Sequence, residues 1–590
     1  MTQNVLILYA TETGTAQDTA DRVARECRRI HIPTQVLSMD RYPQEDLVSE
    51  TLVIFIVSTT GSGTEPRSMT TLWNMLLRSD LPEDLFEDLH FAVFGLGDTA
   101  YEKFCWPAKR LTRRLEGLGA VKICETGEGD EQHLIGIDGA LVPWLRYLSA
   151  SLLALIPPIP DQRIIPLDET PPSRVALVER SSPSPKWHVD PLDQDHEYRT
   201  AMVKCNTRIT AQDWHQDVRH IELDFEDDIE YFPGDVAVVH PITDIDDVES
   251  FLSFMGWANT ADNLLEIKHM YKDQSLPDHL PRFATLRTIF SRYLDFNAVP
   301  RRTFFGYLRH FTSDEAEKER LDEFLSHEHA DELYDYCYRV KRTIQEVLSE
   351  FRKVQIPIDY IFDVFPPLRP RQFSIASSSK ANPRSHPRSI HLCVAIVKYK
   401  TKLKIPRRGV CTRYLSGLKS GDLLRICLLK GFIRLPTNDD TPVVCVGPGT
   451  GIAPMRAVIE ERIHRKAFKN TLYFGCRSAS KDQHYTEEWQ RYSLDKVLTY
   501  RVAFSRDGPE GVKRTYVQDL IIADAAQIWK LLDENGAYLF ISGSSNKMPA
   551  AVKAALRSAA IKYGARSEED ASQYILALER SGRLIEECWS

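Results

Sequence analysis

The chain has 590 residues, a length that predicts several domains. Hydrophobic residues make up 43% and charged residues 27%, a globular balance that leaves material for several buried cores. The formal net charge is −9, and residues 1–150 hold 22 Asp and Glu against 14 Lys and Arg. An acidic N-terminal segment disfavours nucleic acid as a partner and can steer a partner with a basic patch, although acidity can also serve solubility alone.

The eleven cysteines are scattered, with no C-x-x-C pair and no Cys/His cluster of zinc-site spacing. This pattern predicts reduced thiols, as in the cytosol or nucleus, and no metal site. The N-terminus enters a strand at once, without the charge pattern of a signal peptide, and no apolar run is long enough to span a bilayer. We therefore expect a soluble cytoplasmic protein without a membrane anchor.

Residues 1–150 alternate short apolar runs with helical stretches. Val5–Tyr9, Leu52–Ser58 and Phe91–Leu96 have the continuous apolar character of strands buried on both faces, and Ala16–Ile30 has a helical pattern. This rhythm predicts a parallel sheet wound on both faces by helices.

The rest of the chain divides by composition. Eight prolines fall between Pro157 and Pro185, so residues 151–198 are predicted to be a semi-rigid linker. Residues 199–435 return to β patterns, interrupted by a helical insert at about 245–365. Residues 436–590 alternate strands and helices again, which predicts a second doubly wound domain. The expected fold is thus a multidomain α/β protein.

Three loops at the carboxyl ends of the first strands carry hydroxyl groups and glycines. Ligands of open parallel sheets bind outside these strand ends, so the loops together suit a phosphate tail and a planar ring. The first loop lacks the lysine of a nucleotide P-loop, which favours a monophosphate, although each loop alone can be ordinary helix capping. The predicted ligand residues are Thr11, Glu12, Thr13, Gly14, Thr15 and Ala16; Ser58, Thr59, Thr60 and Gly61; and Leu96, Gly97, Asp98, Thr99, Tyr101, Phe104 and Cys105.

These three loops resemble those of flavodoxin, so residues 1–150 are expected to form a flavodoxin-like domain that binds FMN. Tyr101 is then expected to stack on the flavin ring. The sequence departs from related reductases at Thr60, where they often place an aromatic residue on the inner ring face. The resemblance also places Asp130 and Glu131 in a further loop beside FMN, although a charged loop is usually only solvated.

A second group of polar residues lies on the predicted strand Arg371-Gln372-Phe373-Ser374. Arginine is a bidentate phosphate donor, and Phe373 shares its face of the strand, so one can hold a pyrophosphate while the other lies on a ring. Taken alone, the segment can also be an ordinary strand. It resembles the R-x-[YF]-S signature of the ferredoxin–NADP reductase family, where this segment binds FAD and the serine lies near the flavin.

The same family has a glycine-led phosphate turn downstream, which Gly409-Val410-Cys411-Thr412 matches at the start of a predicted helix. Tyr399 matches an aromatic residue ten positions before that turn. Lys341 takes the place of an arginine that related reductases direct to the FAD pyrophosphate, although basic residues on a helix are more often solvated. The resemblance therefore implies a β-barrel FAD domain with a helical connecting insert.

The strand Val443–Val446 runs into Gly447-Pro448-Gly449-Thr450-Gly451, whose glycines allow a pyrophosphate to approach the backbone above a helix start. This loop closely matches the nicotinamide-nucleotide loop of the same family, with Gly449, Thr450 and Gly451 as its ligand residues. Cations beside hydroxyl groups suit a 2′-phosphate, which favours NADPH over NADH. The residues expected there are Ser505, Arg506, Arg514, Tyr516 and Gln518.

The C-terminus places an aromatic residue, Trp589, one position from the end. A terminal tryptophan can simply seal a core edge, but in two-flavin reductases it covers the FAD ring and moves away for nicotinamide. Glu587 takes the place of a family carboxylate near the hydride path, and Ser542 stands where the family has cysteine. The resemblance implies Ser374, Ser542, Glu587 and Trp589 as catalytic residues.

The order of these segments resembles the diflavin reductase family over nearly the whole chain. The resemblance implies hydride transfer from NADPH to FAD, then single electrons through FMN to a protein acceptor. The helical insert would orient the flavin domains, and the linker would let the FMN domain reach the acceptor.

Within that family the chain is most similar to the small soluble NADPH-dependent branch, for which the implied acceptor is an anamorsin-like protein of cytosolic iron–sulfur cluster assembly. Two alternatives remain. One is a reductase for another acceptor, such as sulfite reductase haemoprotein, methionine synthase or a haem monooxygenase. The other is a scaffold that has lost its flavins.

Overall fold

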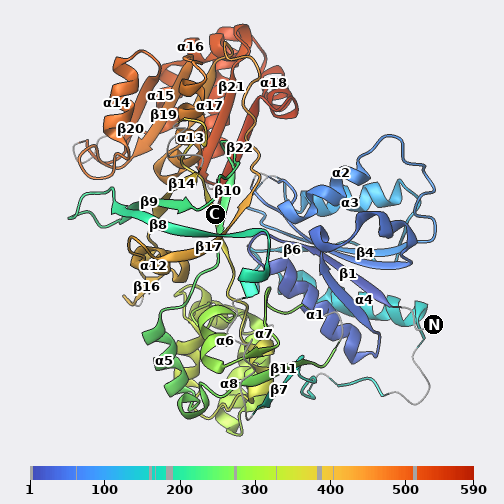
Figure 1. Cartoon of the computed structure of the whole chain (residues 1–590). Helices are drawn as coiled ribbons and strands as arrows, with labels where there is room; N and C mark the ends of the chain where they lie inside the picture. Colours follow the sequence, from blue (N-terminus) through green and yellow to red (C-terminus); the bar gives the residue numbers. More distant parts are fainter. Residues whose placement is uncertain are drawn as a thin grey trace. The chain divides into compact units, whose positions relative to one another are not determined.

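The computed structural model describes residues 4–61, 63–101, 103–157, 163–166, 168–180, 191–271, 275–326, 328–381, 388–402, 404–508, 514–545 and 547–589. The chain forms two compact units, Met1–Trp187 with Glu249–Leu368, and His188–Val248 with Arg369–Ser590 (Figure 1). The helical insert therefore belongs to the same unit as the N-terminal domain.

The N-terminal domain is built on a parallel sheet, as predicted. Its order is β2-β1-β3-β4-β5, and β6 also pairs with β4. Val5 lies opposite Thr34 and Leu6 opposite Val53, so β1 lies between β2 and β3. The strands are β1 (Val5–Ala10), β2 (Thr34–Ser38), β3 (Leu52–Ser58), β4 (His90–Gly97), β5 (Val121–Lys122) and β6 (Gly127–Asp130).

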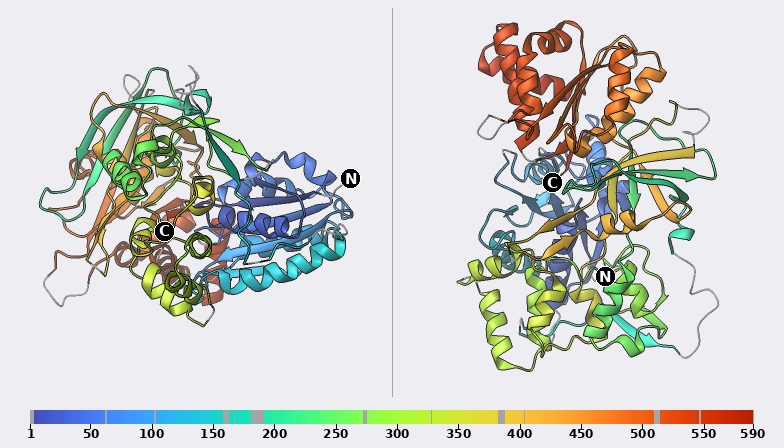
Figure 2. Two further views of the ribbon diagram at one scale, coloured as in Figure 1. Left: turned by 90° about the horizontal axis from the view of Figure 1, so that it is seen from below. Right: turned by 90° about the vertical axis from the view of Figure 1, so that its left-hand side faces the viewer.

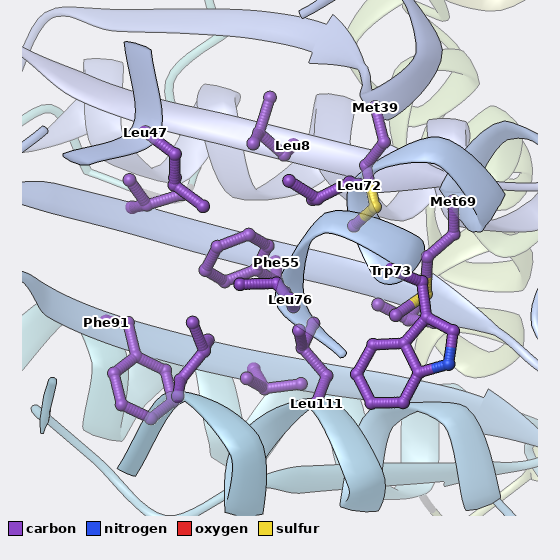
Figure 3. Close-up of a cluster of buried hydrophobic side chains, with 14 of the residues drawn as sticks. Leu8, Met39, Leu47, Phe55, Met69, Leu72, Trp73, Leu76, Phe91 and Leu111 are labelled. Atoms are coloured by element: carbon purple, nitrogen blue, oxygen red, sulfur yellow. The ribbon is translucent and has the colours of Figure 1, made fainter. Parts of the chain in front are cut away.

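Helices cover both faces of this sheet. On one face, α1 (Thr15–Arg29) and α4 (Asp138–Leu155) pack against alternate strand residues. On the other face, α2 (Thr70–Leu76) and α3 (Trp106–Glu116) enclose a core in which Leu72, Trp73, Leu76 and Leu111 surround Phe55 of β3 (Figure 3). Strands buried on both faces explain the continuous apolar runs seen in the sequence.

The segment predicted to be a linker contains a strand. β7 (Val175–Glu179) pairs with β11 (Leu265–His269) of the insert, which also pairs with β12 (Phe283–Ala284). Val175 is fully buried, so this part of the segment packs into a core that its proline content did not predict. The helices of the insert are α5 (Ile245–Phe254), α6 (Leu286–Arg292), α7 (Arg302–Phe311), α8 (Glu315–Leu325), α9 (Ala330–Leu333), α10 (Ile344–Glu350) and α11 (Ile361–Val364).

The second unit begins with a nearly closed antiparallel barrel of order β13-β10-β17-β8-β9-β14. Its two end strands approach each other, because Ile375 bridges Leu392 and the Ala376 N–H donates to the His391 carbonyl at 2.7 Å. The barrel strands are β8 (Tyr198–Arg208), β9 (Val218–Phe225), β10 (Val236–Val239), β13 (Arg371–Ser374), β14 (Ser389–Ala395) and β17 (Leu423–Leu429). Its attached hairpin and helix are β15 (Lys398–Lys400), β16 (Pro406–Arg408) and α12 (Val410–Gly417).

The C-terminal domain repeats the parallel plan with the order β20-β19-β18-β21-β22. Its orange and red helices lie on the two sides of this sheet (Figure 2, right). Helices α13 (Ile452–His464) and α14 (Thr486–Leu494) pack on one face. The opposite face is covered by α15 (Val517–Ala523), α16 (Ala525–Trp529), α17 (Lys547–Gly564) and α18 (Glu568–Arg580). The strands are β18 (Val443–Val446), β19 (Asn470–Cys476), β20 (Thr499–Phe504), β21 (Tyr538–Ser544) and β22 (Leu584–Trp589).

The chain order of this sheet reverses between β18 and β21, which is where open parallel sheets bind their ligands. Among the residues that the structure describes, no helix combines the length and apolar character needed to cross a bilayer.

Candidate active site

The first loop of the N-terminal sheet turns directly from β1 into α1. Gly14 adopts a left-handed conformation with φ of 94°, and its N–H donates to Oγ1 of Thr11 at 2.8 Å. Within the described residues no side chain caps α1, so the N–H groups of its first turn remain available to a phosphate. Glu12 holds the loop in place by accepting a hydrogen bond from the Arg67 N–H at 2.7 Å.

The second loop is closed on itself and tied to the third. Thr60 donates its N–H to the Thr64 carbonyl at 3.0 Å, and positive φ at Gly61 makes the tight turn possible. Thr59 donates its N–H to the Leu96 carbonyl at 2.8 Å. Oγ1 of Thr59 is buried without a hydrogen-bond partner in the part of the chain that the structure describes. A buried hydroxyl of this kind fits a ligand that supplies the missing partner.

The third and fourth loops form one polar network. Asp130 accepts from the N–H and the hydroxyl of Thr99 at 3.0 and 2.7 Å, and Gln132 donates to Asp98 at 3.1 Å. Burial opposes the charged form of Asp130, yet hydrogen bonds from the Gln132 backbone and from Thr99 lower its pKa. Burial raises the pKa of the adjacent Glu131.

Three predicted residues of the third loop have different surroundings. Tyr101 is half-buried and donates its N–H to the Asp98 carbonyl at 3.1 Å. The side chain of Cys105 is fully buried, so this residue can offer a ligand only its backbone. A Cβ on Gly97 would lie 2.9 Å from the Cys105 nitrogen, which explains why glycine stands there.

The predicted FAD residues lie on an edge strand of the barrel. Arg371 and Gln372 of β13 are exposed, and the Arg371 guanidinium donates to the carbonyls of Arg369 and Pro370 at 3.0 and 3.3 Å. Phe373 is half-buried against the barrel core. An exposed guanidinium fits a phosphate ligand, because its remaining donors face solvent.

The glycine-led turn lies at the start of α12. A Cβ on Gly409 would lie 2.8 Å from Oγ1 of Thr412, which itself accepts from the Val397 N–H at 3.1 Å. Burial raises the pKa of the Cys411 thiol to about 12, and the charge of Arg371 partly opposes that rise. A turn that excludes a side chain at the start of a helix suits the close approach of a phosphate.

Two further predicted FAD residues lie elsewhere. Tyr399 is 47% exposed on the hairpin strand β15, opposite Arg407. Lys341 belongs to the first unit, where it follows a π-helical turn with φ of 52°. Its charge acts there, with that of Arg301, on Glu131.

The glycine loop of the C-terminal sheet is shaped by backbone contact. A Cβ on Gly451 would lie 2.1 Å from the Ser542 carbonyl oxygen, so the loop after β18 touches the end of β21. Gly449 has φ of 59°, and a Cβ on Gly447 would lie 2.6 Å from the Gly451 oxygen. Thr450 stands half-buried between them. The turn leads directly into α13, whose N-terminus is a site for a pyrophosphate.

Cations follow β20 at the same edge of this sheet. Ser505 donates its N–H to the Cys476 carbonyl at 3.0 Å, and Arg506 donates its N–H to the Arg477 carbonyl at 2.8 Å. The Arg506 side chain is exposed. The other predicted contacts are Arg514 and Tyr516, both exposed, and Gln518, which is half-buried on α15.

Two of the predicted catalytic residues touch. The Ser374 hydroxyl donates to Oε1 of Glu587 at 2.9 Å, which joins the barrel strand β13 to the C-terminal strand β22. Ser542 lies opposite Glu587 in the parallel register of β21 and β22. Ser542 is fully buried, and its Oγ has no hydrogen-bond partner among the described residues. Trp589 ends β22, and its side chain lies outside what the structure describes.

The sequence did not single out the residues that hold these loops in place. Thr64 closes the second loop, Gln132 supports Asp98, and the Arg67 backbone holds Glu12. For Thr64 a signal existed, because two threonines four apart with glycines between them favour a turn closed by hydroxyl groups.

Comparison with known proteins agrees along the whole chain. The flavodoxin family matches residues 7–144, the FAD binding domain family residues 190–414, and the oxidoreductase NAD-binding domain family residues 445–554. A protein of Cryptococcus neoformans is 41% identical, over 99% of this chain and 100% of its own length. Relatives from Xenopus laevis and Schizosaccharomyces pombe are 38% and 37% identical, over 99% or more of each chain.

All three relatives are named NADPH-dependent diflavin oxidoreductase 1. The three matched families account for FMN, FAD and the nicotinamide nucleotide in the chain order that the sequence predicts. The chain therefore belongs to the NADPH-dependent diflavin oxidoreductases, flavoenzymes that use NADPH, FAD and FMN.

Proposed function

We propose that this enzyme passes its electrons to an anamorsin-like iron–sulfur protein of cytosolic iron–sulfur cluster assembly. The observation that carries the proposal is the similarity to diflavin oxidoreductase 1 proteins at 36–41% identity along the chain. The excess of 22 acidic over 14 basic residues in the first 150 positions supports a partner with a basic face.

Bound FAD would supply an acceptor for the hydride of NADPH, and bound FMN would supply a carrier that releases electrons singly. In our proposal Ser374 orients the Glu587 carboxylate, because its hydroxyl donates to Oε1 at 2.9 Å. The negative charge of Glu587 would then stabilise the positive charge that develops on nicotinamide as hydride leaves it. Ser542 offers its buried hydroxyl on the neighbouring strand.

We assign the binding residues to FMN, FAD and NADPH in turn. We assign FMN to the four loops from Thr11 to Glu131, because the orphaned Thr59 hydroxyl and the uncapped start of α1 lie among them. We assign the FAD pyrophosphate to Arg371 and the Gly409 turn. We assign the pyrophosphate of NADPH to the Gly449–Gly451 turn. We assign its 2′-phosphate to Arg506 and Arg514.

We also place the enzyme in the cytoplasm. All eleven cysteines are free, and burial raises the pKa of the thiols of Cys27, Cys105 and Cys393 to about 12, so these thiols stay protonated and unreactive. Unpaired thiols are typical of a reducing compartment. Cell fractionation tests the assignment, and recovery of the protein with a secretory or membrane fraction would contradict it.

The acceptor is tested by anaerobic electron transfer. The holoenzyme is first reduced with NADPH while the flavin spectra are followed, and equal amounts of candidate acceptors are then added. We expect the iron–sulfur protein to be reduced with a kcat/KM at least about tenfold above that of sulfite reductase haemoprotein or methionine synthase. Faster reduction of either competitor would contradict the proposal.

Two controls separate the steps. Enzyme reduced with dithionite and then freed of excess reductant bypasses NADPH, so an acceptor reduced under both conditions takes its electrons from the flavins. Raising the salt concentration should lower the rate, because exposed charges are screened beyond about 10 Å at 0.1 M salt. A rate that does not respond to salt would leave the acidic domain without a role in docking.

A further inference from the structure

Two neighbouring strands of the barrel bring together three side chains that can ligate a metal. His220 and Glu222 stand two residues apart on β9, so they share one face of the sheet. His391 of β14 lies directly opposite Glu222 in the antiparallel register. One ligand atom from each residue lies within 4.8 Å of the others. Sequence spacing did not reveal this cluster, because its third member comes from a distant strand.

The imidazole of His220 is held in an orientation that suits a ligand. Its Nδ1 lies 3.0 Å from the Tyr485 hydroxyl, and the two rings meet edge to face with centroids 5.6 Å apart. A hydrogen bond at the far ring nitrogen is the usual way in which proteins orient a metal-bound histidine.

The other ring nitrogen of His220 faces Glu222. Nε2 of His220 and Oε1 of Glu222 lie 3.4 Å apart, which is close enough for both atoms to ligate one metal ion. A cation between the two atoms would satisfy both of them.

Two positive side chains lie beside the cluster. Lys204 approaches the other Glu222 oxygen at 3.0 Å, but it is 46% exposed, so it holds the carboxylate weakly. The Arg456 guanidinium lies 3.4 Å from Nδ1 of His391. Its charge is already balanced by Glu460 and Glu488 at 3.3 and 3.0 Å, so it opposes a metal less than a free arginine would.

From this arrangement we propose that His220, Glu222 and His391 form a binding site for one divalent transition-metal ion, best suited to zinc. Two imidazoles and a carboxylate make a ligand set that proteins use for zinc, with water in the fourth position of a tetrahedron. Bound metal links β9 to β14 and, through Tyr485 next to α14, links the barrel to the C-terminal domain.

The test titrates the holoenzyme with zinc chloride against a chromophoric chelator. We expect one equivalent to bind, and the affinity to fall at least about tenfold in both His220→Gln and Glu222→Gln. Lys204→Met should act in the opposite direction and tighten binding several-fold, because it removes the cation that competes for Glu222. His329→Gln is the matched control, since His329 also contacts a carboxylate, at 3.1 Å from Glu332, and should leave the affinity unchanged.

The zinc affinity is expected to fall in the ligand variants and to rise in Lys204→Met, so the two kinds of variant test the proposal independently. Lys204→Met retains all three ligands and changes a half-exposed residue, so it reports on the site even where a ligand variant misfolds. Far-UV circular dichroism and flavin content check the fold of each protein. Unchanged zinc affinity in a folded Glu222→Gln protein, or weaker binding in Lys204→Met, overturns the proposal.

Discussion

The two parallel sheets of this enzyme prepare their ligand loops in different ways. In the N-terminal sheet the loops are polar, and side chains such as Thr99, Asp130 and Gln132 hydrogen-bond across them. In the C-terminal sheet the loop is made of glycines that press on backbone, with Gly451 against the Ser542 carbonyl. Side-chain hydrogen bonds fix the loops of the N-terminal sheet. In the C-terminal sheet, glycines without side chains allow the loop to pack closely against backbone.

This difference suits what each domain binds. FMN is a cofactor that stays bound, and the hydrogen bonds among its proposed loops hold those loops in place. NADPH is a substrate that must enter and leave, so a rigid backbone surface that needs no rearrangement is useful. A side chain that clashes with backbone displaces the whole loop, whereas the loss of one hydrogen bond costs only about 1 kcal/mol. Replacing a loop glycine of the C-terminal sheet should therefore impair ligand binding strongly. Replacing one polar side chain in the loops of the N-terminal sheet should impair it only in part.

The largest effect is expected at Gly451. In Gly451→Val the new side chain meets the Ser542 oxygen, because even a Cβ would lie 2.1 Å from it. The β18 loop must move away from β21, at a cost of about 1–3 kcal/mol in the free energy of unfolding. We expect kcat/KM for NADPH to fall more than about 100-fold, while FMN content stays normal. Steady-state kinetics and flavin extraction measure the two quantities.

Gly306→Ala is the control for glycine replacement as such. Gly306 lies within α7, and a Cβ there meets nothing within 4 Å. Alanine should stabilise this helix by about 0.5–1 kcal/mol and leave NADPH kinetics unchanged. Near-normal kinetics in Gly451→Val would mean that the glycine loop does not shape the nucleotide site.

A smaller effect is expected where the barrel meets the second sheet. Ser374→Ala removes the hydrogen bond to Glu587, and bonds to charged groups are worth about 1.5–3 kcal/mol. The rate of flavin reduction by NADPH, followed by stopped flow, should therefore fall roughly 10- to 100-fold. Ser374→Thr keeps the hydroxyl and should recover most of the rate. Equal losses in both variants would point to packing rather than to the hydrogen bond.

The contrast between the sheets also explains what the sequence could predict. The strands Leu52–Ser58 and Val443–Val446 were predicted with the bounds that the structure has, because buried strands are continuous apolar runs bordered by turns. The positions of the glycine-containing loops were also predicted, because glycines that directly follow an apolar run indicate a turn at the end of a strand.

Long-range contacts could not be predicted in this way. The Ser374–Glu587 hydrogen bond joins residues 213 positions apart, and β7 within the proline-rich segment pairs with β11 of the insert. The cluster of His220, Glu222 and His391 likewise depends on the register of β9 and β14. Pairing of this kind is set by tertiary packing, which local composition does not record.

A substitution that alters the preference of the C-terminal domain for NADPH over NADH should have an intermediate effect on kcat/KM. Arg506→Gln removes an exposed cation after β20 that we assign to the 2′-phosphate. We expect kcat/KM for NADPH to fall roughly tenfold while that for NADH is unchanged, because NADH lacks this phosphate. Steady-state assays with both nucleotides give the ratio. Parallel losses with NADPH and NADH would contradict the assignment and indicate a general disturbance of the domain.

The smallest effect on ligand binding is expected at Thr59 in the N-terminal sheet. There the stability of the FMN-free protein and the affinity for FMN should change in opposite directions. Thr59→Val keeps the shape of the side chain but removes the buried hydroxyl that has no partner among the described residues. The FMN-free protein should be stabilised by up to about 1 kcal/mol, because a buried unsatisfied group is lost, whereas the FMN dissociation constant should rise roughly two- to tenfold.

Thr19→Val is the matched control for that substitution, since the Thr19 hydroxyl is equally buried but already donates to the Thr15 carbonyl at 2.9 Å. Losing a satisfied hydrogen bond should lower stability by about 1 kcal/mol with or without FMN, and should leave FMN affinity unchanged. Urea unfolding of the FMN-free and FMN-bound forms, with fluorescence titration of the flavin, separates the two cases. If Thr59→Val weakened the FMN-free protein and left FMN affinity intact, the hydroxyl would serve the fold rather than the cofactor. The first sheet would then rely on backbone approach, as the second one does.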